Sequence, residues 1–209
     1  MKNLLLAATI AIAGTGVSSM ANAEGTLSAN IGVVSEYHFR GVLQEDFVAS
    51  AGLDYENSGF YAGTWAADVK DGLEVDGYFG YGITRGDFTA SLGFTGYYYT
   101  GDFDDTYEEI NLNLGYAGLS FEYSVGNYEN FGGPELDYDF TALTYEQQGF
   151  YGTYGTFGGD SDGDYFEFGY GMVISGIDFG AALIVADDRL AGGSDDESLI
   201  FSIGKTFDL

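Results

Sequence analysis

The sequence predicts an all-β protein, an antiparallel up-and-down transmembrane β-barrel of about 12 strands. Three observations predict it. Apolar and polar residues alternate along most of the chain, glycine supplies 34 of the 209 residues, and the turns alternate between short and long. Alternation with a period of two is typical of strands with one apolar face, and this much glycine disfavours long helices.

The alternation recurs in segments of about ten residues, which is the length that a tilted strand needs to cross a bilayer. The expected strands are 27–39, 47–55, 61–69, 73–83, 88–98, 110–116, 119–125, 136–142, 150–154, 166–174, 177–185 and 199–209. In the eighth and ninth segments apolar residues on both faces blur which face points outward.

The alternation also assigns an apolar, lipid-facing side to each expected strand. In the first segment this side carries Tyr37 and Phe39. Further members of this side are Tyr61, Gly63, Trp65, Ala67 and Val69 in the third segment, and Leu136, Tyr138, Phe140 and Ala142 in the eighth.

The connections between the segments give an independent test of the barrel. Those after the even segments are short, as at Gly86-Asp87 and Ser175-Gly176, whereas most of the others are longer, as at Gly41–Asp46 and Asn127–Glu135. Short turns at one end, longer loops at the other and an even number of strands are typical of outer-membrane barrels. A soluble sandwich or barrel with an aromatic core is the alternative.

Residues 1–23 are expected to form a cleaved secretory signal peptide, which leaves residues 24–209 as the barrel domain. Lys2 precedes the apolar run Leu4–Ile12, and Ala21-Asn22-Ala23 fits a cleavage site. An uncleaved anchor is the alternative, but the run is shorter than the ~20 residues that span a bilayer. We therefore expect export through the inner membrane and residence in the outer membrane of a Gram-negative cell.

The charge and the rare residue types exclude several classes of function. There are 33 Asp and Glu against 6 Lys and Arg, a net charge of -27, so no cationic surface for nucleic acid can form. With no Cys and one His, a thiolate site or a metal cluster of imidazoles has no ligands. The sequence also contains no Gly-x-Ser-x-Gly elbow, the hydrolase motif whose serine would have to work with His38. We predict no catalytic residues, no metal site, no cofactor and no enzymatic activity.

If the apolar face meets lipid, the other face makes a strongly acidic interior, to which Glu109 also belongs. One Arg cannot neutralise so many carboxylates, and burying them unpaired is costly. Water and mobile cations are the cheaper solution, and rings of Asp and Glu select cations. The predicted pore-lining residues are Glu36, His38, Arg40, Asp54, Asp68, Glu74, Asp76, Glu122, Glu167 and Asp178.

These observations favour a porin-like channel for small cations or other small solutes, in contact with outer-membrane lipid and lipopolysaccharide. The alternative is a closed barrel that acts as a structural or surface-binding module through its acidic loops. The segment Asp160-Ser-Asp162-Gly-Asp164 begins like an EF-hand loop, but Tyr165 and Gly171 stand where Gly and Glu are required. A solvated acidic rim is therefore favoured over a calcium or magnesium site. The solute and the oligomeric state stay open.

Four motifs carry a resemblance to a known family. They are Ser35-Glu36-Tyr37-His38-Phe39-Arg40-Gly41, Gly52-Leu53-Asp54-Tyr55, Ser58-Gly59-Phe60-Tyr61-Ala62-Gly63-Thr64-Trp65 and Glu74-Val75-Asp76. With them the chain resembles the TorF-like putative porins, proteobacterial outer-membrane proteins long catalogued as conserved and of unknown function. The resemblance implies an outer-membrane barrel but brings no functional residues. Leu43 before Gln44, and Leu209 in place of a final Phe, depart from the expected pattern.

Overall fold

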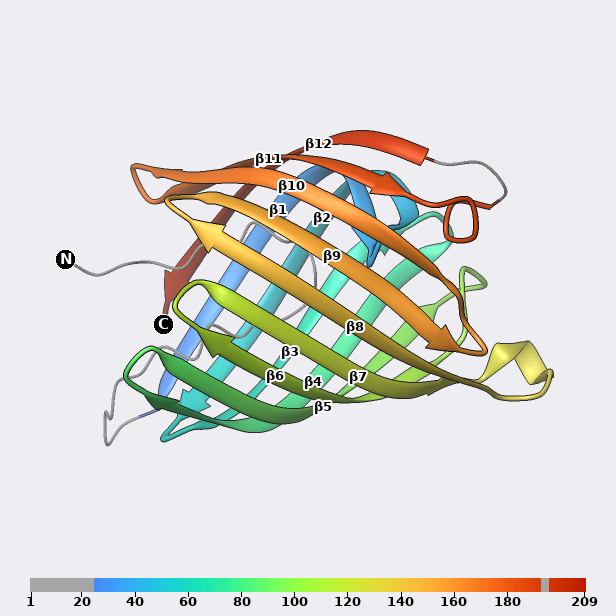
Figure 1. The fold of residues 1–209 in the computed structure, drawn as a ribbon, viewed down its shortest axis with the longest axis horizontal. Helices are drawn as coiled ribbons and strands as arrows, with labels where there is room; N and C mark the ends of the chain where they lie inside the picture. The colour runs from blue at the N-terminus through green and yellow to red at the C-terminus, as the bar shows by residue number, and fades with distance from the viewer. Residues whose placement is uncertain (1–24, 193–195) are drawn as a thin grey trace.

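The computed structural model describes residues 25–192 and 196–209, and its strands close into one barrel (Figure 1). Each strand pairs antiparallel with its neighbours in the chain, and β12 pairs with β1 to close the barrel. The antiparallel barrel of 12 strands that the sequence predicts is thereby confirmed. The expected signal peptide lies outside the described residues. The strands are β1 (Thr26–Phe39), β2 (Val42–Asn57), β3 (Phe60–Val69), β4 (Gly72–Arg85), β5 (Phe88–Thr100), β6 (Tyr107–Tyr116), β7 (Leu119–Tyr128), β8 (Leu136–Gln147), β9 (Phe150–Gly159), β10 (Gly163–Ile174), β11 (Ile177–Ala186) and β12 (Asp196–Asp208).

The short turns lie at the end of the barrel where β1 begins and β12 ends (Figure 1). Several are two-residue turns with positive φ at both central residues, as at Ser58 and Gly59 or at Ser175 and Gly176. This geometry follows the twist of the strands and favours glycine at its second position. The longer loops lie at the opposite end, where the short 3₁₀ helix η1 (Asn130–Gly132) precedes β8.

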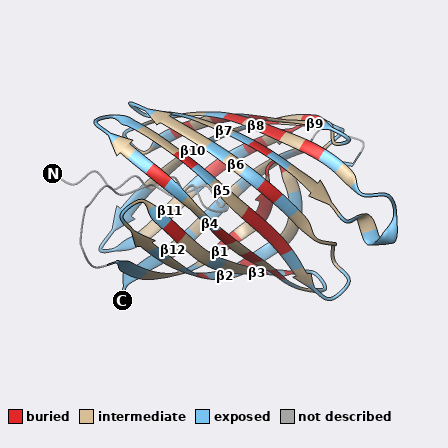
Figure 2. Ribbon diagram, turned by 90° about the horizontal axis from the view of Figure 1, so that it is seen from below, coloured by how far each residue is buried: buried red, intermediate tan, exposed pale blue. Residues whose placement is uncertain are grey.

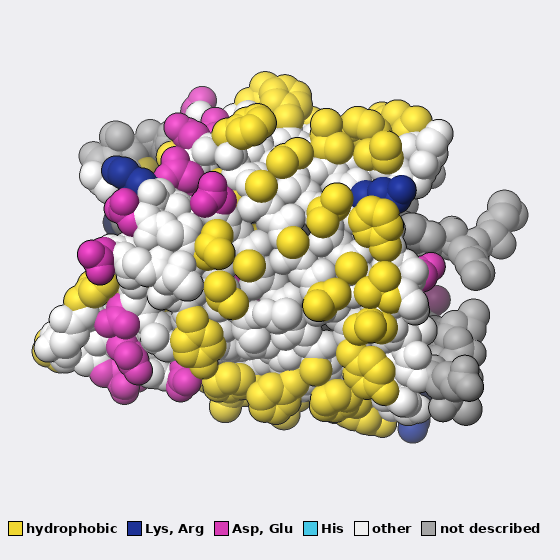
Figure 3. Space-filling model, turned by 180° about the vertical axis from the view of Figure 1, so that it is seen from behind, with side chains coloured by type: hydrophobic (Ala, Val, Ile, Leu, Met, Phe, Trp, Pro, Cys, Tyr) yellow, Lys and Arg dark blue, Asp and Glu magenta, His cyan; other side chains and the backbone are white. Residues whose placement is uncertain are grey.

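The outer wall is apolar. Large side chains such as Ile31, Phe79, Leu92, Ile110 and Phe166 are each more than half exposed. In Figure 3 hydrophobic side chains are spread over the wall, and acidic ones gather at the end with the longer loops. An apolar surface of this extent is costly in water and suits a lipid environment.

No helix of residues 25–192 or 196–209 is long and apolar enough to cross a membrane.

The end of the β1–β2 hairpin leaves the wall. Pairing between β1 and β12 stops at Val34, and pairing between β2 and β3 begins at Ser50. Between these points Glu36–Phe39 pairs only with Val42–Asp46 of the same hairpin, with a bulge after Tyr37. We call residues 35–48 the inner hairpin.

The inner hairpin folds into the lumen. The Tyr37 hydroxyl donates to Glu74 on β4, the Phe39 ring lies 5.3 Å from that of Tyr97 on β5, and Arg40 reaches Glu109 on β6. By strand order, β6 and β7 lie across the barrel from β1. The hairpin tip therefore crosses the barrel interior, where Tyr37 is 0% and Arg40 6% exposed.

This arrangement corrects the predicted connection Gly41–Asp46. The turn consists of Arg40 and Gly41, and β2 already begins at Val42. It also corrects the predicted outward direction of Tyr37 and Phe39. The inner hairpin has left the wall, so neither of its faces meets lipid, and both rings contact residues of the inner face.

The faces predicted for β3 and β8 were also wrong. The apolar positions of β3 and of β8 point inward, where several of them join two clusters around the inner hairpin. In Figure 2 the buried residues lie within the strands and the turns are exposed. One cluster contains Val34, Tyr37, Val48 and Ala67, with Phe39, Trp65 and Ile200 packed against it; the other contains Phe140, Ala142, Tyr165, Ile184 and Ala186, with Phe157, Leu190 and Ile200. These side chains are apolar because they pack inside the barrel.

The outward direction of Leu112, in the middle of β6, gives a test of the faces. Leu112→Arg should impair barrel assembly, because an Arg at the bilayer midplane costs about 2–4 kcal/mol. Asn113→Arg is the control, since Asn113 faces inward opposite Glu122. The measurement is the fraction of protein that migrates as a folded barrel on an unboiled detergent gel. Equal loss in both variants would contradict the assignment.

Candidate functional site

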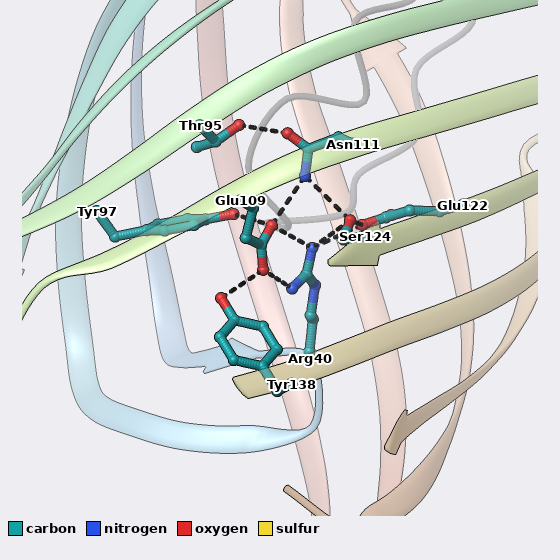
Figure 4. Close-up of polar contacts among 8 residues, drawn as sticks. All are labelled: Arg40, Thr95, Tyr97, Glu109, Asn111, Glu122, Ser124 and Tyr138. Carbon is teal, nitrogen blue, oxygen red and sulfur yellow. Dashed lines mark hydrogen bonds and ion pairs between the residues drawn. The ribbon is translucent and has the colours of Figure 1, made fainter. Parts of the chain in front are cut away.

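Arg40 binds two carboxylates on the far wall of the lumen (Figure 4). Its guanidinium group donates to both oxygens of Glu109, with 3.0 Å between Nη2 and Oε2. The same Nη2 donates to Glu122 Oε1 at 2.7 Å and to Ser124 Oγ at 3.2 Å. A fork of parallel hydrogen bonds between guanidinium and carboxylate is among the strongest polar contacts in proteins.

Glu109 is the centre of the polar network. Its side chain is 0% exposed, and besides Arg40 it accepts hydrogen bonds from Tyr97 at 3.1 Å, Tyr138 at 2.8 Å and Asn111 at 2.8 Å. The buried charge is therefore fully compensated. The sequence placed Glu109 on the inward face but could not pair it with Arg40, which lies 69 positions away.

Two aromatic rings and a glycine fix the tip of the inner hairpin. The Arg40 guanidinium lies 4.1 Å from the centre of the Phe140 ring and 4.9 Å from that of Phe39, which is within the range of cation–π attraction. Gly41 has a φ of +88°, and a Cβ there would come within 2.9 Å of Tyr165. Only glycine satisfies both the turn and this close approach.

Nine of the ten predicted pore-lining residues lie on the inner face or on the inner hairpin, and Asp68 does not. Asp68 is exposed on the outer face of β3, opposite Leu73, because the inward side of this strand belongs to Trp65, Ala67 and Val69. The residues that do face inward are Glu36, His38, Arg40, Asp54, Glu74, Asp76, Glu122, Glu167 and Asp178.

A second group of inward residues lines a small cavity beside the inner hairpin. Glu36 Oε2 lies 3.1 Å from His38 Nε2, and Tyr151 donates to Glu167 on the opposite side. The cavity measures about 30 Å³, which is enough for one or two waters. On this side the space between hairpin and wall is therefore narrow.

The acidic loops at the far end are organised by Arg189. Its guanidinium lies 2.9 Å from Asp162 and 3.2 Å from Asp164, and it also pairs with Asp187. Although desolvation acts to raise it, the pKa of Asp187 is lowered by hydrogen bonds from Arg189 and from the backbone N–H groups of Leu190 and Asp164. In the segment that begins like an EF-hand loop, Asp162 and Asp164 thus pair with an arginine, and Asp160 accepts a hydrogen bond from the Asp137 backbone N–H. Among the described residues, no three His, Asp or Glu side chains are grouped to hold a metal ion.

The fold defines the class of this protein, a closed antiparallel barrel of the kind found in outer-membrane porins. The NanC porin matches with a TM-score of 0.52 and 14% identity over 88% of this chain and 100% of that one. A second structure, from work on the in-meso crystallization of membrane proteins, matches with a TM-score of 0.62 and 10% identity over 88% of this chain and 84% of that one. At these identities the likeness concerns the fold.

Residues 18–148 match the model of a family described as "Bacterial protein of unknown function (Gcw_chp)", and the chain belongs to this family. No curated protein sequence matches it. The family description states no activity, so the TorF-like resemblance stays a resemblance.

The ion pair between Arg40 and Glu109 gives a second test. Arg40→Gln leaves Glu109 buried without a counter-charge, and breaking a buried pair in this way costs about 3–5 kcal/mol. We expect a matching fall in the free energy of unfolding, measured by denaturant titration in detergent. The double variant Arg40→Gln/Glu109→Gln should recover most of the loss.

Arg85→Gln is the matched control, because Arg85 is exposed at the end of β4. An Arg40→Gln protein as stable as the wild type would mean that the pair does not hold the hairpin.

Proposed function

We propose that the protein is an outer-membrane, porin-like channel that prefers cations and is narrowed by its own inner hairpin. The acidic interior carries the proposal. Of the Lys and Arg residues that the structure describes, Arg40 alone is buried, and it faces an inner wall of many carboxylates. Fixed negative charge along a narrow path attracts cations and repels anions.

Five partly exposed carboxylates in the lumen also support the cation preference. Glu36, Asp54, Glu122, Glu167 and Asp178 are neither fully buried nor fully exposed. Because these carboxylates are only partly covered, their charged forms lose less hydration than those of fully buried acids such as Asp76. They supply a negative lining that runs from Glu36 on the inner hairpin to Asp54 and Asp178 near the short turns.

The packing of the inner hairpin supports a second candidate, the closed barrel. Tyr37, Arg40 and Phe140 fill the interior where the hairpin crosses it, and each is at most 6% exposed. A barrel sealed in this way would act as a structural or surface-binding module.

Conductance in a planar bilayer separates the two candidates. The channel proposal expects small steps from the wild type and larger steps from Arg40→Ala/Glu109→Gln, which removes the side chain that bridges the lumen without leaving Glu109 charged. The control Arg85→Ala/Glu108→Gln makes the same charge change at two exposed positions and should conduct like the wild type. Silence from the wild type and from both variants would favour the closed barrel.

Selectivity tests the acidic lining directly. In a salt gradient we expect a cation-selective reversal potential, strongest at low salt because the Debye length falls from ~10 Å at 0.1 M to ~3 Å at 1 M. The triple variant Glu36→Gln/Asp54→Asn/Asp178→Asn should move the potential toward zero.

The matched control removes the same charges from the outer face, as Asp68→Asn/Glu108→Gln/Asp139→Asn. It should leave the reversal potential close to that of the wild type. Anion selectivity in the wild type, or equal shifts in the two triple variants, would contradict a negative lumen.

A further inference from the structure

Two carboxylates of the inner face lie under the inner hairpin. Glu74 is 1% and Asp76 0% exposed. They stand two positions apart on one face of β4, so their Cα atoms are about 7 Å apart. Asp76 lies between Trp65 of β3 and Tyr97 of β5 in the strand register, and Tyr37 of the inner hairpin covers Glu74.

These carboxylates lack the partners that compensate Glu109. Glu74 Oε1 accepts a hydrogen bond of 2.7 Å from the Tyr37 hydroxyl. Within the described part of the chain, no hydrogen-bond donor contacts either oxygen of Asp76, and Glu74 Oε2 has only the hydroxyl of Tyr99, its neighbour on β5, close by. Asp76 is therefore a buried carboxylate without any donor, and it stands on the same face of β4 as the buried Glu74.

Among residues 25–192 and 196–209, no Lys or Arg side chain is available to this region. Arg40 already binds Glu109 and Glu122, and Lys70, Arg85, Arg189 and Lys205 are exposed. Buried carboxylates without a partner must bind a cation or take up protons. The charge of the pair, two negative units, is balanced by one divalent cation.

We propose that Glu74 and Asp76 bind one calcium ion beneath the inner hairpin. Calcium accepts oxygen ligands in irregular arrangements, whereas magnesium demands a near-ideal octahedron and gives up its water reluctantly. A monovalent ion would leave one negative charge uncompensated. This proposal rests on the proposed channel function in one respect: cations must be able to enter the lumen.

The affinity follows from the ligand set. Since no third acidic or histidine side chain joins the pair among the described residues, hydroxyl, backbone carbonyl or water oxygens complete the coordination. Few charged ligands give weak sites, with dissociation constants on the order of 10⁻⁴–10⁻³ M in extracellular calcium modules.

Trp65 reports on the site directly. It is the one tryptophan of the chain, it lies opposite Asp76, and its ring centre is 5.6 Å from that of Tyr37. We would titrate calcium chloride into the purified, chelator-treated barrel in detergent and follow tryptophan emission. The expected result is a saturable change that potassium chloride at equal ionic strength does not produce.

Three variants locate the response. Glu74→Gln and Asp76→Asn should each weaken half-saturation by about tenfold or more, because the charge of the ligands sets calcium affinity. Asp68→Asn removes one charge from the neighbouring strand on the opposite face and should titrate like the wild type. Calorimetric titration of the wild type, expected to give one ion per chain, tests the site even where a variant fails to fold.

A wild-type protein without a saturable calcium response would overturn the proposal and would mean that protons neutralise the pair. A response that survives both Glu74→Gln and Asp76→Asn would overturn it as well. The calcium titrations are made in detergent and do not depend on conductance. A protein that binds calcium but does not conduct would contradict only the channel function, and one that conducts but does not bind calcium would contradict only the calcium site.

Discussion

One ion pair, between Arg40 and Glu109, determines the arrangement of the barrel interior. It joins the tip of the inner hairpin to the far wall, and its atoms are almost fully shielded from solvent. The tyrosine and asparagine donors around Glu109 form a network that has this pair at its centre. Because a buried charge is tolerated only with its partners in place, the hairpin, β6 and β7 act as one unit.

The hairpin in turn explains why the inner wall is partly apolar. A porin-like lumen is expected to be polar throughout, yet Trp65 and Ala67 on one side and Phe140 and Ala142 on the other face inward. They pack against the hairpin or around its tip, and acidic and neutral polar side chains, such as Asp54 and Asn111, line the rest of the wall. The interior thus combines a packed core with acidic side chains and a small cavity beside it.

The sequence was sufficient to predict the fold but only part of the site. Strand number, strand direction and most turn positions follow from local alternation and from glycines such as Gly59 and Gly176, whose conformation is a local property. The inner hairpin depends on contacts between residues far apart in the chain, and an apolar residue that packs inside looks the same in sequence as one that faces lipid. Asp68 was misplaced for this reason, because Trp65 and Val69 set the wrong face for its strand.

The departure of the inner hairpin leaves the wall one hairpin short at the loop end. Between the start of β12 and Phe201, no described residue of β1 forms a strand pair with β12. One hydrogen bond remains there, in which the Phe201 backbone N–H donates to Ser35 Oγ at 2.8 Å. Backbone polar groups without partners cannot face hydrocarbon. In the proposed membrane, the acyl layer must therefore end near Val34 and Ser50 on this side of the barrel. The edges of β12 and β3 that lack a strand partner then lie among hydrated headgroups.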